Sequence, residues 1–117
     1  MSKADIRVNL CGVELKNPVI TASGTFGYGQ EYTDFMDVSA LGGICSKGVT
    51  YVPKYGNEGR RLAETPAGLI NSIGLQNPGV QHFIDHELPA MLKLGPAVLA
   101  NLGGASIEDY EAGAALL

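Results

Sequence analysis

The sequence contains no tryptophan, only two cysteines, and few charged side chains. Its 8 Lys and Arg residues are outnumbered by 12 Asp and Glu residues, which gives a formal net charge of −4. Phosphate-backbone binding requires clustered basic side chains, and the longest basic run is the pair Arg60 and Arg61, so the composition argues against a nucleic-acid partner. The 117 residues, 45% of them hydrophobic, suffice for one core but not for two ordinary domains. We therefore expect residues 1–117 to form a single segment.

Signals for secretion, membrane insertion and metal binding are also missing. The first ten residues include Asp5 and no apolar stretch typical of a secretory signal, so we expect a cytoplasmic location. Polar side chains interrupt the uncharged stretch 65–84, so we expect no transmembrane helix. Cys11 and Cys45 have neither CxxC spacing nor a neighbouring His or Cys cluster, which indicates two reduced thiols and no metal site.

The first half of the chain predicts a hairpin followed by alternating strands and helices. Residues 6–15 alternate apolar and polar around a two-residue turn, which predicts a β-hairpin. Residues 19–22 predict a buried strand that opens into a loop at residues 23–24. The composition of residues 30–38 predicts a helix, and residues 43–47 predict a second strand. The helix would turn three side chains inward: Tyr32, Phe35 and Met36.

The middle of the chain contains a long aperiodic segment and then a clear helical pattern. Residues 48–76 show no sustained period of 2 or 3.6, and so long a connection inside a compact domain is usually functional. Asn77 and Pro78 are predicted to begin a helix, with Asn77 as its cap, and Pro89 is predicted to end or kink it. The predicted inward face consists of Val80, Phe83, Ile84, Leu88 and Met91.

The end of the chain adds a third strand and a further helix. Residues 97–101 predict the strand, and Ser106 with Asp109 resembles a capping box for a helix that is still running at Leu117. Repeated alternation of strand and helix predicts parallel strands with helices packed outside them. Because three such strands complete neither an open sheet nor a closed barrel, we expect an α/β fold that is the opening portion of something longer.

Polar residues follow each predicted strand. Ser23 follows the first, Lys47 ends the second, Asn71 lies in the loop after it, and Asn101 ends the third. The carboxyl ends of parallel strands are where α/β proteins assemble ligand sites, and glycines accompany each of these positions. This pattern predicts a site, although serine, asparagine and glycine are also common turn formers that need no ligand.

The chain contains four distinctive runs: NPVITASG at 17–24, SKGVT at 46–50, NSIGLQNPG at 71–79 and LANLGG at 99–104. Together they resemble the amino-terminal part of class 1 dihydroorotate dehydrogenases. The asparagine-centred run is the most specific of them, and the lysine-containing run comes next. The sequence as a whole is most similar to subclass 1B, whose catalytic subunit works with an electron-transfer subunit that carries FAD and an iron–sulfur cluster.

This resemblance implies the amino-terminal part of an FMN-containing (β/α)₈ TIM barrel, preceded by the β-hairpin and incomplete in this chain. It implies oxidation of dihydroorotate to orotate in de novo pyrimidine biosynthesis, with the proton-abstracting base expected beyond Leu117, and an oligomeric protein. The residues implied to bind FMN are Ser23, Lys47, Gly48 and Asn101. The residues implied to bind substrate are Lys47, Asn71, Ser72, Ile73, Gly74 and Leu75.

Other interpretations stay open. A related FMN barrel acting on another dihydropyrimidine would share these runs, and a non-catalytic α/β fragment that assembles with copies of itself would share the elements. His82 and His86 have a spacing that suits a metal, but they are predicted to face solvent, opposite the apolar helix face. Cys45 is interpreted as a small core residue and not as the base.

Overall fold

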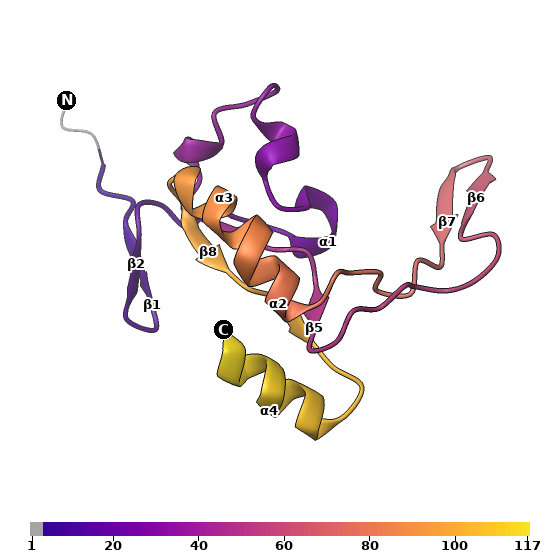
Figure 1. Ribbon diagram of the computed structural model, residues 1–117. Coiled ribbons are helices and arrows are strands. Elements are labelled where there is room, and N and C mark those ends of the chain that lie inside the picture. The colour runs from indigo at the N-terminus through magenta and orange to yellow at the C-terminus, as the bar shows by residue number, and fades with distance from the viewer. Residues whose placement is uncertain (1–3) are drawn as a thin grey trace.

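A three-stranded parallel sheet forms the centre of the computed structural model, which describes residues 4–117 (Figure 1). Its strands are β3 (Ile20–Thr21), β4 (Gly43–Cys45) and β8 (Ala97–Leu99), in the order β3-β4-β8. A second parallel pair, β5 (Val49–Thr50) and β9 (Leu102–Gly103), follows β4 and β8 along the chain. Parallel strands joined through helical segments confirm the predicted α/β organisation.

The amino-terminal hairpin forms as its alternation predicts. Strands β1 (Val8–Leu10) and β2 (Val13–Leu15) pair antiparallel, with Val8 opposite Leu15. Both turn residues have positive φ, 50° at Cys11 and 92° at Gly12, as a two-residue turn matched to the strand twist requires. The turn therefore sets the register of this hairpin.

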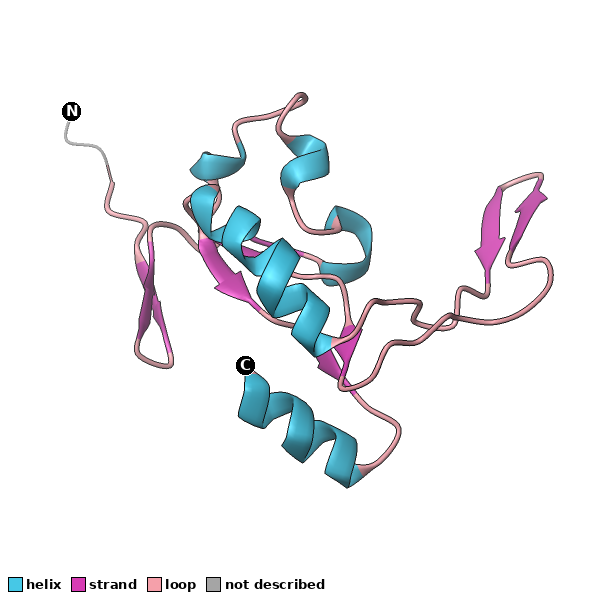
Figure 2. Cartoon of the chain, viewed as in Figure 1, coloured by secondary structure: helices cyan, strands magenta, loops and turns pink. Residues whose placement is uncertain are grey.

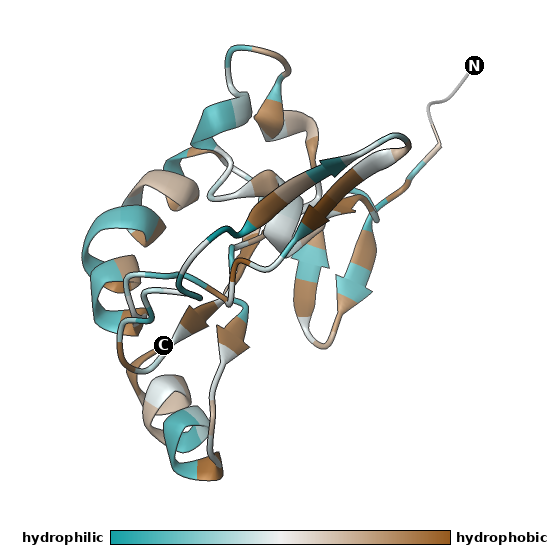
Figure 3. Ribbon diagram, turned by 90° about the vertical axis from the view of Figure 1, so that its right-hand side faces the viewer, coloured by the Kyte–Doolittle hydropathy of each residue, from teal (hydrophilic) through white to brown (hydrophobic). Residues whose placement is uncertain are grey.

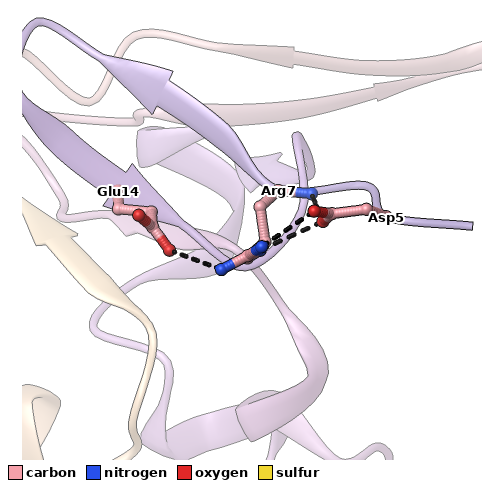
Figure 4. A network of polar contacts seen from close by, with 3 residues as sticks. All are labelled: Asp5, Arg7 and Glu14. Carbon is pink, nitrogen blue, oxygen red and sulfur yellow. Dashed lines mark hydrogen bonds and ion pairs between the residues drawn. The ribbon is translucent and has the colours of Figure 1, made fainter.

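Charged side chains surround the entry to the hairpin (Figure 4). The Arg7 guanidinium lies 2.8 Å from an Asp5 carboxylate oxygen and 3.4 Å from a Glu14 oxygen. Hydrogen bonds from Arg7 hold the pKa of the Asp5 carboxyl below its ordinary value. All three side chains are exposed, so these pairs add little to the free energy of unfolding.

The segment after β3 differs from its prediction in two ways. The expected loop at residues 23–24 is instead the start of a short helix, α1 (Ser23–Phe26). The strand before it is not buried, because one of its sides pairs with no other strand within residues 4–117, and Ile20 is 37% exposed. Strand β3 is therefore an open edge of the described sheet.

The helix predicted for residues 30–38 is wrong. Only two 3₁₀ turns form in this part of the chain, at Gln30–Tyr32 and Val38–Ala40. The Asp37 side chain accepts a hydrogen bond from the Ser39 backbone, a local bond of the kind that competes with helix formation. Tyr32 stacks on Phe26 with ring centroids 4.3 Å apart, as an inward residue should. Phe35 and Met36 are exposed, at 83% and 40%.

The helix after residue 79 presents the predicted apolar face but begins later than predicted. It runs through α2 (Val80–His82), a π-helical segment at Phe83–Glu87 and α3 (Leu88–Lys93), and α3 packs against β8 (Figure 2). Proline lacks an N–H and crowds the preceding turn. The wider π segment just before Pro89 accommodates it, so the helix continues to Lys93. Val80, Phe83 and Met91 are fully buried, and Ile84 and Leu88 pack against them.

The aperiodic segment 48–76 contains a second hairpin, which the sequence pattern did not predict. Strands β6 (Leu62–Thr65) and β7 (Gly68–Asn71) pair antiparallel and project from the body, at the opposite end from β1–β2 (Figure 1). Figure 3 shows apolar residues along its strands, and Ile70 is 64% exposed. The radius of gyration is 16.5 Å, whereas a compact domain of this length has about 13 Å. We call this projecting hairpin the arm.

The last described helix begins as predicted. Helix α4 (Ile107–Leu116) has Ser106 at its N-cap, and the Ser106 hydroxyl accepts a hydrogen bond from the Asp109 backbone at 3.2 Å. Gly113 faces Leu102, and a Cβ there would lie 2.7 Å from a Leu102 methyl carbon. Glycine at this position therefore lets α4 approach β9 closely. Within residues 4–117, no helix combines the length and the apolar character needed to cross a membrane.

Candidate functional site

The candidate site lies at breaks in two neighbouring strands. Lys47 falls between β4 and β5, and Asn101 falls between β8 and β9. The Ser46 N–H donates to the Leu99 carbonyl at 2.9 Å, and the Val49 N–H donates to the Asn101 carbonyl at 2.9 Å. The two breaks therefore lie side by side. The prediction that Lys47 and Asn101 end their strands is therefore wrong, because each chain segment pairs again beyond them, in β5 and β9.

Ser23 and Asn101 meet although 78 positions separate them in the sequence. The Asn101 Nδ2 group donates a hydrogen bond to Ser23 Oγ at 3.0 Å, and both side chains are partly buried. Ser23 is the first residue of α1, directly after β3, so the parallel sheet brings it beside the break that contains Asn101. Two of the predicted cofactor-binding residues thus form one polar pair.

A buried hydroxyl connects Asn101 with the segment around Lys47. Ser46 Oγ accepts a hydrogen bond from the Asn101 N–H at 3.0 Å and donates one to the Lys47 carbonyl at 3.0 Å. The Lys47 N–H in turn donates to the Gly27 carbonyl at 3.0 Å. Through these hydrogen bonds Ser46 holds the backbone of both breaks in place. The motifs did not predict a role for it.

Replacing Ser46 with alanine is expected to lower the free energy of unfolding by about 1–3 kcal/mol, because the Asn101 N–H loses its partner in a buried place. Urea denaturation measures the change. Ser39→Ala is the matched control, since it removes an exposed hydroxyl that bonds only Asp37 and is expected to change stability by less than about 0.5 kcal/mol. Equal losses in the two variants would contradict the role assigned to Ser46.

The Lys47 ammonium is a partly buried charge beside a hollow. The hollow has a volume of about 570 Å³ and is lined by loop residues of the strand ends and by α2. In the part of the chain that the structure describes, the Lys47 side chain has neither an ion pair nor a hydrogen bond. An unpaired cation at such a place is suited to a ligand with negative charge or carbonyl oxygens. The lining residues are Tyr28, Lys47, Pro53, Lys54, Tyr55, Gln76, Asn77, Pro78, His82 and Glu87.

Tyr28 contributes a second polar group to this hollow. Its hydroxyl is buried and has no hydrogen-bond partner among residues 4–117. Burial raises the pKa of the Tyr28 phenol, and the negative charges of Glu87 and Glu31 raise it further. The hydroxyl therefore keeps its proton at neutral pH.

Leu75 packs against both strand breaks. Its backbone has a positive φ of 54°, and its side chain packs against two glycines. A Cβ at Gly48 would lie 2.8 Å from Leu75 Cδ1 and 3.4 Å from Asn101 Nδ2, and one at Gly103 would lie 3.1 Å from Leu75 Cδ2. Glycine at position 48 therefore lets Leu75 and Asn101 lie against the same stretch of backbone.

The remaining residues of the predicted substrate loop lie at the base of the arm. Asn71 ends β7 opposite Leu62 and is exposed, and no hydrogen bond within residues 4–117 joins it to Lys47 or Asn101. Asn57 Nδ2 donates to the Ser72 carbonyl and hydroxyl at 3.1 and 3.0 Å. The Asn57 N–H donates to the Ile73 carbonyl at 3.0 Å.

Gly74, the next residue of the loop, has φ 77° and packs directly on Asn57, since a Cβ there would lie 2.6 Å from the Asn57 amide carbon. Asn57 supports the loop through these contacts, and no motif signalled it. The structure thus brings together Ser23, Gly48, Leu75 and Asn101. Lys47 precedes Gly48 in the chain, and its side chain lines the hollow. No hydrogen bond among residues 4–117 joins Asn71 or Ser72 to that group.

The two histidines of the helix have the predicted exposure. His82 and His86 are exposed, with rings stacked at a centroid distance of 4.2 Å. Within residues 4–117, no group of three or more His, Cys, Asp or Glu side chains is placed to hold a metal. Cys11 and Cys45 are free thiols, and Cys45 is partly buried.

Comparison with known proteins gives the same family as the motifs. The family model for dihydroorotate dehydrogenase matches residues 5–117. The catalytic subunit of dihydroorotate dehydrogenase B (NAD(+)) from Oceanobacillus iheyensis is 50% identical over 107 residues, which cover 92% of this chain and 35% of the relative. The subunit of the same name from Alkaliphilus metalliredigens is 49% identical over 110 residues, covering 94% of this chain and 36% of the relative.

A third relative of the same name, from Parabacteroides distasonis, is 50% identical over 107 residues, with 92% of this chain and 35% of the relative covered. The chain therefore spans about a third of the length of the curated relatives it matches. The family model extends from the entry of the first hairpin to the end of α4 and includes every residue of the polar group described above. The chain belongs to the dihydroorotate dehydrogenase family.

Proposed function

We propose that this chain forms the amino-terminal portion of the catalytic subunit of an FMN-dependent dihydroorotate dehydrogenase, which oxidises dihydroorotate to orotate in pyrimidine biosynthesis. The proposed fold is a (β/α)₈ barrel, entered through the β1–β2 hairpin, with β3, β4 and β8 as its first strands. Such a barrel needs about 250 residues. The single observation that carries the proposal is that, in a chain of this family, the Ser23–Asn101 hydrogen bond lies at one strand break and the neighbouring break contains Lys47, whose ammonium is unpaired among residues 4–117.

The side chains present fit a flavin. Lys47, Ser23 and Asn101 offer an ammonium, a hydroxyl and an amide, and none of these is a carboxylate that would repel a phosphate or a reduced flavin. In the proposed arrangement Ser23 and Asn101 bind FMN by hydrogen bonds, and Gly48 leaves room at the backbone between them. FMN, when bound, supplies the acceptor for a hydride.

Lys47 is proposed to act on both ligands. Placed at the pyrimidine edge of the flavin, its ammonium stabilises negative charge that develops there on reduction, since opposite charges about 4 Å apart interact by a few kcal/mol where water is partly excluded. It also attracts the carboxylate of dihydroorotate. Lys47 thereby tunes the cofactor and holds the substrate beside it.

The loop from Asn71 to Leu75 is proposed to select the substrate. A planar carboxamide such as that of Asn71 offers both a donor and an acceptor, which matches the alternating N–H and C=O edge of a pyrimidinedione. Gly74 leaves backbone donors open to a carboxylate. Because Asn71 lies at the base of the arm and no hydrogen bond among residues 4–117 joins it to Lys47 or Asn101, we propose that the arm moves toward the strand breaks when substrate binds. The base is assigned to the part of the relatives' length that this chain does not span.

The partner is proposed from the names of the relatives. They are called catalytic subunits of an NAD(+)-dependent enzyme. By the same subclass resemblance, we propose a cytoplasmic, oligomeric protein whose second subunit carries FAD and an iron–sulfur cluster and passes electrons from FMN to NAD(+).

Anaerobic mixing tests this function. In a full-length catalytic subunit that carries this segment and is loaded with FMN, dihydroorotate is expected to bleach the flavin absorbance within a single turnover. Dihydrouracil, which lacks the carboxylate, is the matched control and is expected to leave the flavin oxidised. Bleaching by dihydrouracil alone would instead assign the protein to flavin barrels that act on other dihydropyrimidines.

A further inference from the structure

Asn77 is a buried polar residue whose amide does something other than the predicted capping. Its side chain and backbone are only 6% exposed. The helix that follows has Gly79 at its N-cap and no side-chain cap bond. The side-chain amide of Asn77 therefore makes hydrogen bonds other than a helix cap. Asn77 lies two residues after the end of the proposed substrate loop.

Every hydrogen-bonding position of this amide is filled. Asn77 Oδ1 accepts from the N–H groups of Thr50 and Gly79, each at 2.9 Å. Asn77 Nδ2 donates to the Leu75 carbonyl at 2.8 Å and to Thr50 Oγ1 at 3.0 Å. The Thr50 hydroxyl spends its own proton on the Val52 carbonyl at 2.6 Å, so it can accept from Asn77. A flipped amide would face two N–H donors with its own NH₂ group, which fixes the orientation.

One of these bonds holds a strained residue. Leu75 has a φ of 54°, a region that costs a non-glycine residue energy and persists only where the surroundings hold it. The Asn77 amide holds the Leu75 carbonyl on one side, and Gly48 and Gly103 receive the Leu75 side chain on the other. The same amide is anchored to β5 through Thr50. Asn77 therefore ties the end of the 71–75 loop to the strand that follows Lys47 and Gly48.

We propose that Asn77 is a positioning residue for substrate: it fixes Leu75, and with it the end of the 71–75 loop, against the strand break that carries Lys47. This inference rests on the proposed function, because it assumes that the loop binds dihydroorotate and orotate. Asn77 itself need not touch either ligand.

Asn77→Asp tests the tether with little change in shape. One carboxylate oxygen still accepts from Thr50 and Gly79, whereas the other replaces the donor and faces the Leu75 carbonyl. The loop end is expected to leave its position, so the dissociation constant of orotate rises about tenfold or more while FMN stays bound. The measurement is an orotate titration of the oxidised, FMN-loaded full-length subunit, followed by the shift in flavin absorbance, which requires no turnover.

Thr50→Val is the matched control. It removes a buried hydroxyl from the same network, and so lowers stability, but the bond from Asn77 to Leu75 remains. Its orotate affinity is expected to stay within about twofold of the unmodified protein. Thermal unfolding of both variants separates a loss of stability from a loss of affinity. If Asn77→Asp does not yield FMN-loaded protein, Asn77→Ser, which is too short to reach the Leu75 carbonyl, is titrated in its place.

The outcomes separate the inference from the function beneath it. Weakened orotate binding in the Asn77 variant with normal binding in Thr50→Val supports the positioning role. Equal affinity in both variants, or equal losses that follow their stability, overturns it while leaving the enzyme assignment intact. If the unmodified protein holds FMN but binds no orotate, the proposed function is wrong, and so is the positioning role that rests on it.

Discussion

Lys47→Ala is expected to slow the reduction of the bound flavin by dihydroorotate about 100-fold or more, the usual cost of removing one preorganised electrostatic group from an active site. Lys47 is partly buried and has no ion-pair partner within residues 4–117, so its charge is available to a bound ligand. Alanine leaves the charge that develops on the flavin without its counterion, and it leaves the substrate carboxylate without a partner. Rapid anaerobic mixing of the FMN-loaded full-length subunit measures the rate.

Lys54→Ala is the control for this result. Lys54 lines the same hollow but is exposed. Its backbone pairs with that of Asn77, and this pairing does not depend on the Lys54 side chain. Its loss is expected to change the rate less than about threefold, since a solvent-screened charge contributes little. Lys47→Arg, which keeps the charge but not the geometry, should fall between the two. Reduction of the Lys47→Ala flavin at the unmodified rate would refute the role assigned to the ammonium.

The 117-residue chain by itself is expected to retain no FMN and to oxidise no dihydroorotate. Its proposed flavin-binding set amounts to one polar pair and one ammonium, and no hydrogen bond among residues 4–117 joins Asn71 to them. The sheet is open at β3, and large apolar side chains such as Phe35 and Ile70 are exposed by 83% and 64%. Surface of this kind favours association with further protein over an independent fold.

Desalting after incubation with FMN measures retention, and light scattering measures size. The full-length subunit, treated in the same way, is expected to stay yellow. A yellow, monomeric and active preparation of residues 1–117 would show that they contain a whole site. A colourless but well-defined oligomer would favour the alternative of a self-assembling fragment.

Local patterns predicted the elements that local forces decide. The β1–β2 hairpin follows from a two-residue turn with φ above zero at both positions. The apolar face at Val80, Phe83 and Met91 follows from helical periodicity, and the start of α4 follows from the Ser106 cap. The helix predicted for residues 30–38 was wrong because amino-acid composition does not show where local hydrogen bonds compete with a helix. Here the Asp37 side chain accepts a hydrogen bond from the Ser39 N–H.

The arm was missed for a different reason. Burial imposes a period of 2 on a strand only when one of its faces meets a core, and every residue of β7 is exposed. Strands β6 and β7 therefore carry no alternation to detect. Among residues 4–117 the two strands pair only with each other, across a turn, and they project from the rest of the described chain (Figure 1).

The sequence by itself determined the family, the order of the first hairpin, the parallel strands and the later helices, and the chemical identity of the groups at the site. Only the tertiary structure decided which of those groups meet. Strand pairing places Ser23 on Asn101 across 78 positions, and the demand of a buried amide for four partners turns Asn77 from a helix cap into a tether of Leu75. Pairing register and the satisfaction of buried polar atoms depend on the whole packed chain, whereas turns, caps and periodicity depend on a few neighbouring residues.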